Sequence, residues 1–178
     1  MKVIECNKKF RFDEIREDDT DDILRLRNNP AIRNRFTYRK DISKERHLRW
    51  LKENVQARKS IQYIIIDKDA ERTIGSIYLK NINWFNHNAE YGIVLGGDKK
   101  EDLEYEKEIA ECFLQYAFNE LKLHKIYLKL FPDDSKSIEI YESIGFKKEG
   151  ILRKDVCVDG IYQDMIRMGK VSESSENI

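Results

Sequence analysis

Cysteine and histidine are both scarce in this sequence. The three cysteines, Cys6, Cys112 and Cys157, are far apart and form no CxxC pair. A sparse, odd set of this kind is typical of reduced thiols in the cytosol rather than of a disulfide framework. The sequence also has only three histidines, and none has the spacing of metal ligands. We therefore expect no metal site.

The sequence also lacks an excess of one charge and a long apolar run. Its 33 Lys and Arg residues are balanced by 33 Asp and Glu residues. Nucleic-acid binders and membrane-surface binders usually carry a basic excess, so we expect neither partner. No apolar run approaches the roughly 18 residues of a membrane-spanning helix, and the first apolar run breaks at Glu5, unlike a signal peptide. The composition predicts a cytoplasmic α/β or α+β protein.

Proline and glycine are too few to mark a linker. The chain has 178 residues, two prolines and eight glycines, with no internal repeat. About 40% of the residues are apolar, and a chain of this length buries roughly two thirds of its unfolded surface. We expect one domain over residues 1–170, followed by a polar tail at 171–178.

The hydrophobic pattern changes period along the chain. Period-2 alternation and β-branched runs predict strands at 10–16, 61–67, 73–82, 89–95 and 125–130, a further strand that begins at 146–149, and paired runs at 153–158 and 161–168. Helical spacing predicts helices at 20–28, 43–58, 103–121 and 135–143. Asp159-Gly160 predicts a tight hairpin turn. A meander followed by a βαβ crossover predicts an α/β fold, with a mixed sheet of six to seven strands and helices on both faces.

Four segments resemble a known family. They are AEYGI at 89–93, YAFNELKLHKI at 116–126, DSKSIEIYESIGFKKEG at 134–150 and DGIYQD at 159–164. Together they closely resemble the GNAT superfamily of acetyl-CoA-dependent N-acetyltransferases, in the branch of the ribosomal-protein N-terminal acetyltransferases. The most specific part is a tyrosine, Tyr141, followed by Glu-x-x-Gly-Phe. Residues 26–33 and 42–50 are similar to the nucleotide-amino-sugar N-acetyltransferases of pseudaminic acid synthesis. The resemblance implies a GNAT-like fold and acetyl-CoA as co-substrate.

Acetyl transfer to an amine needs a base for the amine, donors for the developing oxyanion and an acid for the departing thiolate. By resemblance, Glu90 lies on the strand beside the acetyl group and is the candidate base, acting directly or through one water. The alternative interpretation of Glu90 is an ordinary strand residue whose side chain faces outward. Tyr141 is the candidate acid, because a phenol stays protonated at neutral pH. Its alternative is a core tyrosine that anchors the short helix.

The resemblance also implies where the cofactor binds. The backbone of Ile93, Val94 and Leu95 would pair with the pantetheine arm and supply the oxyanion donor. Asp134 stands where the family often has an asparagine that contacts the cofactor. An aspartate keeps the acceptor of that side chain but loses its amide donor.

The sequence departs from the family at the pyrophosphate loop. GNAT proteins have a basic residue followed by x-x-Gly-x-Gly or Ala, because glycines let free N–H groups approach the anion. Here no glycine follows Gly97, and residues 98–108 hold six acids and three lysines. The stretch could form a helix with no cofactor role. Alternatively, the phosphates could shift toward Lys99, Lys100 or Lys107.

Two functions follow from these patterns. The favoured one is an N-acetyltransferase that acts on a primary amine, either an amino sugar or a peptide N-terminus. The alternative is a degenerate GNAT-like domain without acetyl-CoA turnover, which serves as a ligand-binding or interaction module. Homodimers are common in the resembling branch, so a homodimer is compatible with this interpretation. His47 is expected at a solvated helix position, and Trp50 as a partly buried aromatic.

Overall fold

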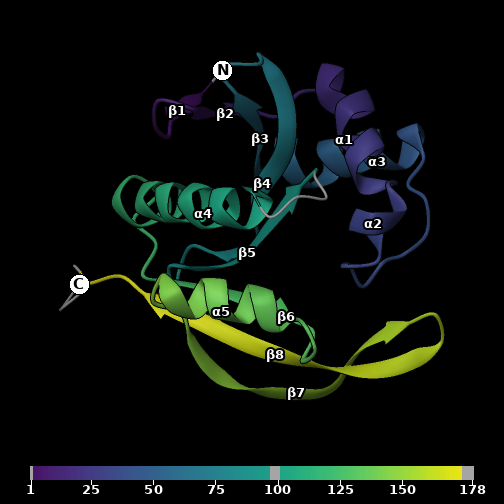
Figure 1. The fold of residues 1–178 in the computed structure, drawn as a ribbon, viewed down its shortest axis with the longest axis vertical. Helices are drawn as coiled ribbons and strands as arrows, with labels where there is room; N and C mark the ends of the chain where they lie inside the picture. Colours follow the sequence, from purple (N-terminus) through teal and green to yellow (C-terminus); the bar gives the residue numbers. More distant parts are fainter. Residues whose placement is uncertain (1, 97–100, 174–178) are drawn as a thin grey trace.

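The computed structural model describes residues 2–96 and 101–173, which form one mixed sheet flanked by helices (Figure 1). The eight strands of the described residues are β1 (Val3–Glu5), β2 (Phe10–Glu14), β3 (Ile61–Asp67), β4 (Arg72–Asn83), β5 (Asn88–Leu95), β6 (Lys125–Leu130), β7 (Lys147–Val158) and β8 (Ile161–Val171). The helices are α1 (Thr20–Arg27), α2 (Pro30–Arg33), α3 (Lys44–Trp50), α4 (Glu101–Asn119) and α5 (Ser135–Ser143), with a 3₁₀ turn at Glu17–Asp19 and a π-helical turn at Leu51–Gln56.

The strand order is β1-β2-β3-β4-β5-β6-β8-β7. Among the strands of residues 2–96 and 101–173, only the β5–β6 pair is parallel, and α4 makes the crossover between these two strands. All other neighbouring strands are antiparallel. The predicted parallel neighbours, at 89–95 and 125–130, are therefore confirmed, and so is the mixed α/β fold.

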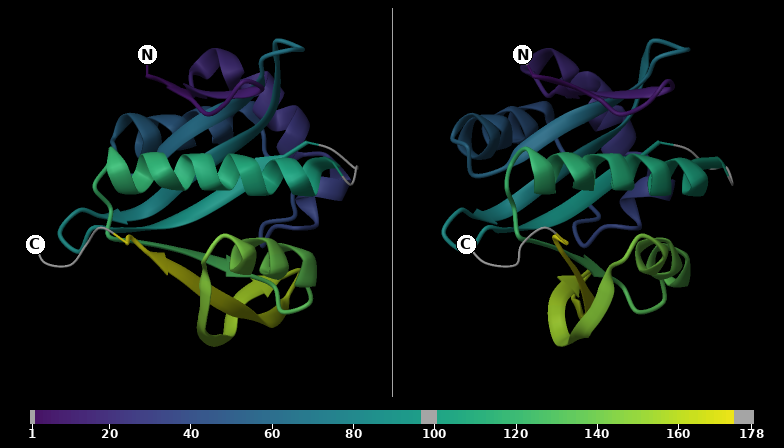
Figure 2. Two further views of the ribbon diagram at one scale, coloured as in Figure 1. Left: turned by 60° about the vertical axis from the view of Figure 1, so that its left-hand side comes forward. Right: turned by 90° about the vertical axis from the view of Figure 1, so that its left-hand side faces the viewer.

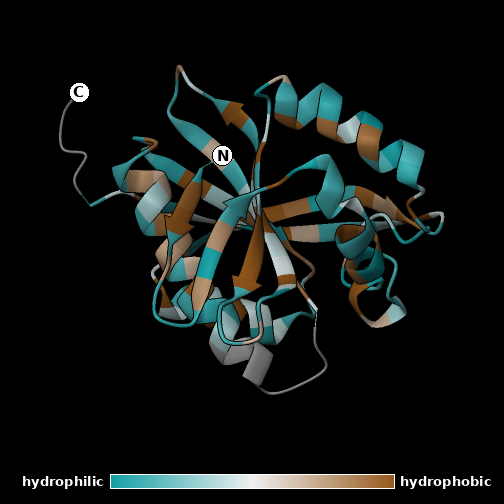
Figure 3. Ribbon diagram, turned by 90° about the horizontal axis from the view of Figure 1, so that it is seen from above, coloured by the Kyte–Doolittle hydropathy of each residue, from teal (hydrophilic) through white to brown (hydrophobic). Residues whose placement is uncertain are grey.

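Both faces of the sheet are covered (Figure 2). Tyr63 and Ile65 of β3 belong to the large core that includes Phe113 of α4. Ile64 and Ile66 point to the opposite face and pack in a second cluster, together with residues from the α1 and α3 side. This two-sided burial explains why 61–67 is a nearly continuous apolar run. Hydrophobic residues accordingly concentrate in the central strands (Figure 3).

Local sequence signals set several helix and turn boundaries. Asn29 caps α2 by accepting a hydrogen bond from the Ala31 N–H at 3.0 Å, and Pro30 takes the first helical position. Pro30 thus lies just beyond the end of α1 and starts a short helix that the sequence analysis missed. The predicted turn at Asp159 and Gly160 is confirmed, since both residues have positive φ, 51° and 86°.

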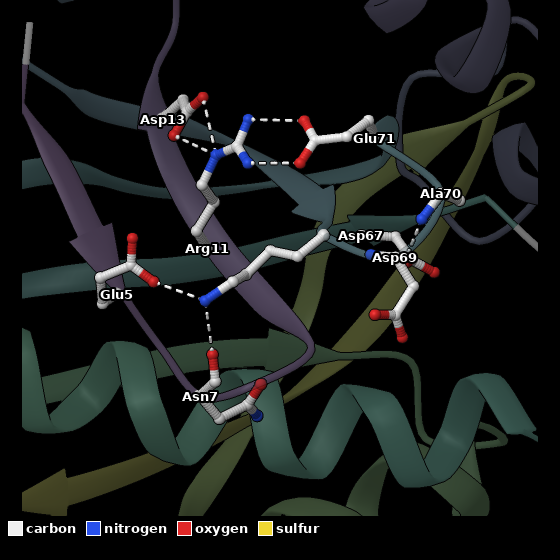
Figure 4. Close-up of polar contacts among 9 residues, drawn as sticks. Glu5, Asn7, Arg11, Asp13, Asp67, Asp69, Ala70 and Glu71 are labelled. Carbon is white, nitrogen blue, oxygen red and sulfur yellow. Dashed lines mark hydrogen bonds and ion pairs between the residues drawn. The ribbon is translucent and has the colours of Figure 1, made fainter.

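The first strand, β1, adds an eighth strand to the six or seven that were predicted. It has three residues and lies at the sheet edge against β2, too short for an alternating pattern. Polar contacts surround this edge (Figure 4). Arg11 bonds Asp13 and Glu71, and Lys68 donates to the Glu5 carboxylate at 2.7 Å. Exposed pairs of this kind contribute at most about 1 kcal/mol each.

The three cysteines are free thiols. Although they are far apart in the sequence, the fold brings Cys6 into hydrogen-bonding contact with Cys112 on α4. This contact raises the pKa of Cys6, and burial of the thiol is the second largest cause of the increase. Within the described ranges, no helix is long and apolar enough to cross a membrane.

Candidate active site

A pocket opens where β5 and β6 separate. Their pairing covers only Asn88 to Glu90 on β5, opposite Lys125 to Tyr127 on β6. Beyond these pairs, the β6-facing edge of β5 has no ladder partner among the described strands. The pocket has a volume of about 340 Å³ and is closed from the sides by the segment after α2, by α4 and by α5.

Six residues predicted from the sequence line this pocket: Glu90, Ile93, Val94, Leu95, Asp134 and Tyr141. They come from strand β5, from helix α5 and from the turn before it. The unpaired β5 edge places backbone N–H and C=O groups beside the pocket, where a ligand with amide groups could pair with them.

Of the three lysines predicted to meet the phosphates, Lys107 is the one among the described residues. Lys99 and Lys100 lie outside the described residues. Lys107 is exposed on α4 and does not line the pocket. Asp134 has a structural task as well, because its carboxylate caps α5 by accepting from the Ser137 N–H at 3.3 Å.

Tyr141 is held at the pocket wall by α5. Its side chain is only 3% exposed, and its ring packs edge-on against Tyr91 and Phe146. Burial raises the pKa of Tyr141 well above the ordinary phenol value, and the neighbouring Tyr91 and Glu106 add to this shift. The phenol therefore keeps its proton at any physiological pH. Tyr91 is also buried, and burial raises its pKa well above the ordinary phenol value as well.

The Tyr141 hydroxyl donates to Glu106, which the sequence analysis had counted only among the six acids of residues 98–108. Glu106 Oε1 accepts this hydrogen bond at 3.0 Å, and Oε2 lies 3.6 Å from Nη2 of Arg35. Glu106 is 3% exposed and lines the pocket. Burial raises the pKa of Glu106, whereas Arg35 and the Tyr141 hydroxyl lower it.

The helical spacing carried a signal that could have located Glu106. It precedes Ile109 by three residues and Phe113 by seven, so it shares the buried face of α4 with them. Counting Glu106 with the acids of a phosphate-facing loop was wrong for this residue. Arg35 has no comparable signal, because it lies in an irregular segment and reaches both Glu106 and, at 3.4 Å, Ser137.

Glu90 faces the pocket with two partners. Its carboxylate lies 3.1 Å from Lys80 Nζ and accepts from Asn81 Nδ2 at 3.0 Å. Glu90 is 8% exposed, so it is not the outward-facing strand residue of the alternative interpretation. These two contacts hold the Glu90 carboxylate in place at the pocket wall.

His47 contradicts its expected solvated position. It is 6% exposed, stacks on Trp50 with ring centroids 6.3 Å apart, and leaves Nε2 without a partner within the described part of the chain. Burial lowers its pKa. His47 does not line the pocket, so it is a buried packing residue of α3.

Known proteins share this fold and much of this sequence. The model of the acetyltransferase (GNAT) domain matches residues 9–147. Over 104 residues the chain is 31% identical to spermidine N(1)-acetyltransferase of Vibrio cholerae, a match that spans 58% of this chain and 60% of that relative's length. Over 140 residues it is 31% identical to acetyltransferase PseH of Campylobacter jejuni, which covers 78% of this chain and 83% of the relative.

A solved structure superposes on this chain over most of the length of both chains. The crystal structure of spermidine N-acetyltransferase from Vibrio cholerae in complex with CoA and spermine superposes with a TM-score of 0.84 at 25% identity. The superposition covers 93% of this chain and 96% of that one.

Proposed function

The chain belongs to the GNAT acetyltransferase family, and from that premise we propose that it transfers an acetyl group from acetyl-CoA to a primary amine by direct attack. One observation carries the proposal. The pocket at the β5–β6 separation brings a protonated phenol, Tyr141, and a carboxylate, Glu90, to the same cavity. These are the acid and the base that the reaction requires.

Each lining group has a task in the proposed reaction. The unpaired edge of β5 at Ile93–Leu95 would bind the pantetheine amides and donate an N–H to the oxyanion. Glu90 would take the amine proton, directly or through one water. The amine lone pair then attacks the thioester carbonyl, the C–S bond breaks, and Tyr141 gives its proton to the departing sulfur.

In this proposal, the phosphates of acetyl-CoA are bound by lysine side chains and not by a glycine-rich loop. Lys99, Lys100 and Lys107 are the cations near the start of α4 and remain the proposed partners of the phosphates, among six acids. We therefore expect weaker acetyl-CoA binding than an intact glycine loop would give.

The acceptor is proposed to be an amino sugar or a peptide N-terminus. The pocket wall next to β5 includes two aromatic rings, Phe36 and Phe131, together with Arg35 and Thr37. Such a mixed wall suits a polar acceptor with a flat or ring-shaped body. The domain boundary at residue 170 and a homodimer stay predictions, the latter to be checked by size-exclusion chromatography with light scattering.

The test measures release of CoA thiol with acetyl-CoA and a panel of amines: a peptide, an amino sugar and spermidine. We expect turnover with at least one, and a kcat for Tyr141→Phe about 10²–10⁴-fold lower at nearly unchanged KM for acetyl-CoA. Tyr127→Phe is the matched control, since Tyr127 lies on β6 outside the pocket. Absence of both turnover and acetyl-CoA binding by calorimetry would favour the interaction module instead.

A further inference from the structure

Glu106 is a buried acid that neither proposed proton transfer uses. It sits in the second turn of α4, where the next two residues, Lys107 and Glu108, are exposed. Its two oxygens nevertheless point inward, to the Tyr141 hydroxyl at 3.0 Å and to the Arg35 guanidinium at 3.6 Å. A carboxylate on the pocket wall, bonded to the candidate acid, affects what that acid can do.

The constraint follows from the number of protons on a phenol. A tyrosine hydroxyl has one proton and therefore makes one donor bond at a time. While Tyr141 donates to ionised Glu106, its proton is directed away from the position of a leaving sulfur. If the carboxyl is protonated, its O–H donates to the phenol oxygen, and the phenol proton is free to turn toward the pocket.

We propose that Glu106 is a positioning residue that sets the direction of the Tyr141 hydroxyl: the protonated carboxyl releases this hydroxyl to donate to the departing thiolate, and the carboxylate retains it. This role rests on the proposed acetyl transfer with Tyr141 as the acid. It makes the protonation state of Glu106 a condition for rapid collapse of the tetrahedral intermediate.

The surroundings of Glu106 allow both protonation states. Arg35, from the segment after α2, attracts a negative charge, and Asp134, in the cap of α5, repels one. Tyr141 on α5 bonds the carboxyl, and Tyr91 on β5 lies beside Tyr141. Burial is the largest influence and raises the pKa of Glu106 above its usual value.

The protons balance over one cycle. When the C–S bond breaks, its electron pair stays on sulfur, which takes the Tyr141 proton. The phenol oxygen then takes the carboxyl proton of Glu106, which is left as a carboxylate. The proton that the amine nitrogen loses to Glu90 reaches water, and Glu106 takes one proton from water to restore the starting state.

The test is the pH dependence of kcat at saturating acetyl-CoA and amine. Above the pKa of Glu106, the wild-type kcat should decrease about tenfold per pH unit until it reaches the value of Tyr141→Phe. Glu106→Gln should lose this decrease, because an amide N–H donates to the phenol oxygen at every pH. Its KM for acetyl-CoA should stay within about twofold of wild type.

Glu111→Gln is the matched control, because Glu111 lies on the same helix with an exposed side chain. It should keep the wild-type profile. Infrared difference spectra between acid and alkaline pH supply a second readout: the C=O band of a buried protonated carboxyl should appear in wild type and Glu111→Gln and be missing in Glu106→Gln.

The outcomes distinguish the positioning role of Glu106 from the proposed acetyltransferase activity. Turnover combined with an alkaline decrease that persists in Glu106→Gln overturns the positioning role and leaves the acetyltransferase proposal standing. The same holds for an infrared band that survives this substitution. Absence of acetyl transfer to any amine overturns the proposed function, and the positioning role with it.

Discussion

Replacing Glu106 with glutamine should stabilise the protein at pH 8 and leave its stability nearly unchanged at pH 4. Glu106 is 3% exposed, and burial raises its folded-state pKa. Its contribution to stability is therefore fully present below the pKa of an unfolded glutamate, and it is lost as the pH rises through the folded-state pKa. Glutamine keeps the volume and the hydrogen bond to Tyr141 but carries no charge that must be buried.

The magnitude follows from linkage. Each unit by which folding raises the pKa of Glu106 corresponds to about 1.4 kcal/mol of stability lost at alkaline pH. For a chain of this size, 1 kcal/mol shifts the melting temperature by roughly 2–4 °C. The pH-dependent difference between Glu106→Gln and wild type thus measures the shift directly.

The assay is urea unfolding at pH 4 and at pH 8, with thermal unfolding as a check. Glu111→Gln, which changes the same charge on the exposed side of α4, should stay within about 0.5 kcal/mol of wild type at both pH values. A Glu106→Gln protein that is less stable than wild type at pH 8 would refute the reasoning. It would mean that the Arg35 pair outweighs the burial of the charge.

Three further substitutions test the core and the site. Phe113→Ala should lower the free energy of unfolding by about 3–5 kcal/mol in urea, because Phe113 is fully buried and its ring contacts Phe12, Tyr63, Tyr91 and Tyr116; a loss below 1 kcal/mol would contradict its central place. Glu90→Gln should reduce kcat about 10²–10⁴-fold if Glu90 is the base, and an unchanged kcat in the thiol-release assay would leave it only as the partner of Lys80 and Asn81. Gly92→Ala should destabilise the fold by about 1–3 kcal/mol, because a Cβ there would lie 2.3 Å from the Tyr78 ring; thermal unfolding equal to wild type would show that the ring moves freely.

Most of the fold could be predicted from hydrophobic periodicity, because its elements have a buried face with a regular spacing. The strands at 61–67 and 125–130 and the helix at 135–143 have the predicted boundaries. The second helix was predicted to reach residue 58, but α3 ends at Trp50 and a π-helical turn continues to Gln56. The three-residue β1 and the four-residue α2 are shorter than the windows in which periodicity can be recognised.

The candidate site could be predicted only in part. Tyr141 and Glu90 were named because the segments that contain them resemble the family, and the structure places both in one pocket, while their roles stay predictions. Arg35 was missed because its place depends on the contact between its Nη2 and Oε2 of Glu106, 71 residues away in the chain. Glu106 was missed although its helical spacing to Ile109 and Phe113 indicates a buried position. Charge counted along the sequence could not distinguish a buried carboxylate from its exposed neighbours.

The separation between β5 and β6 also has a consequence for folding. The strands β1 to β5 each pair antiparallel with the next strand along the chain, although α1 to α3 lie between β2 and β3, and β7 and β8 form a hairpin. The two halves of the sheet are joined at its middle by only three residue pairs, between Asn88–Glu90 and Lys125–Tyr127. Formation of the β5–β6 pairing requires all of α4 to become ordered and gains only these few strand pairs. Contacts between residues so far apart in the sequence form slowly during folding. The opening in which the substrate is proposed to bind is thus also the place where the two halves of the sheet are joined.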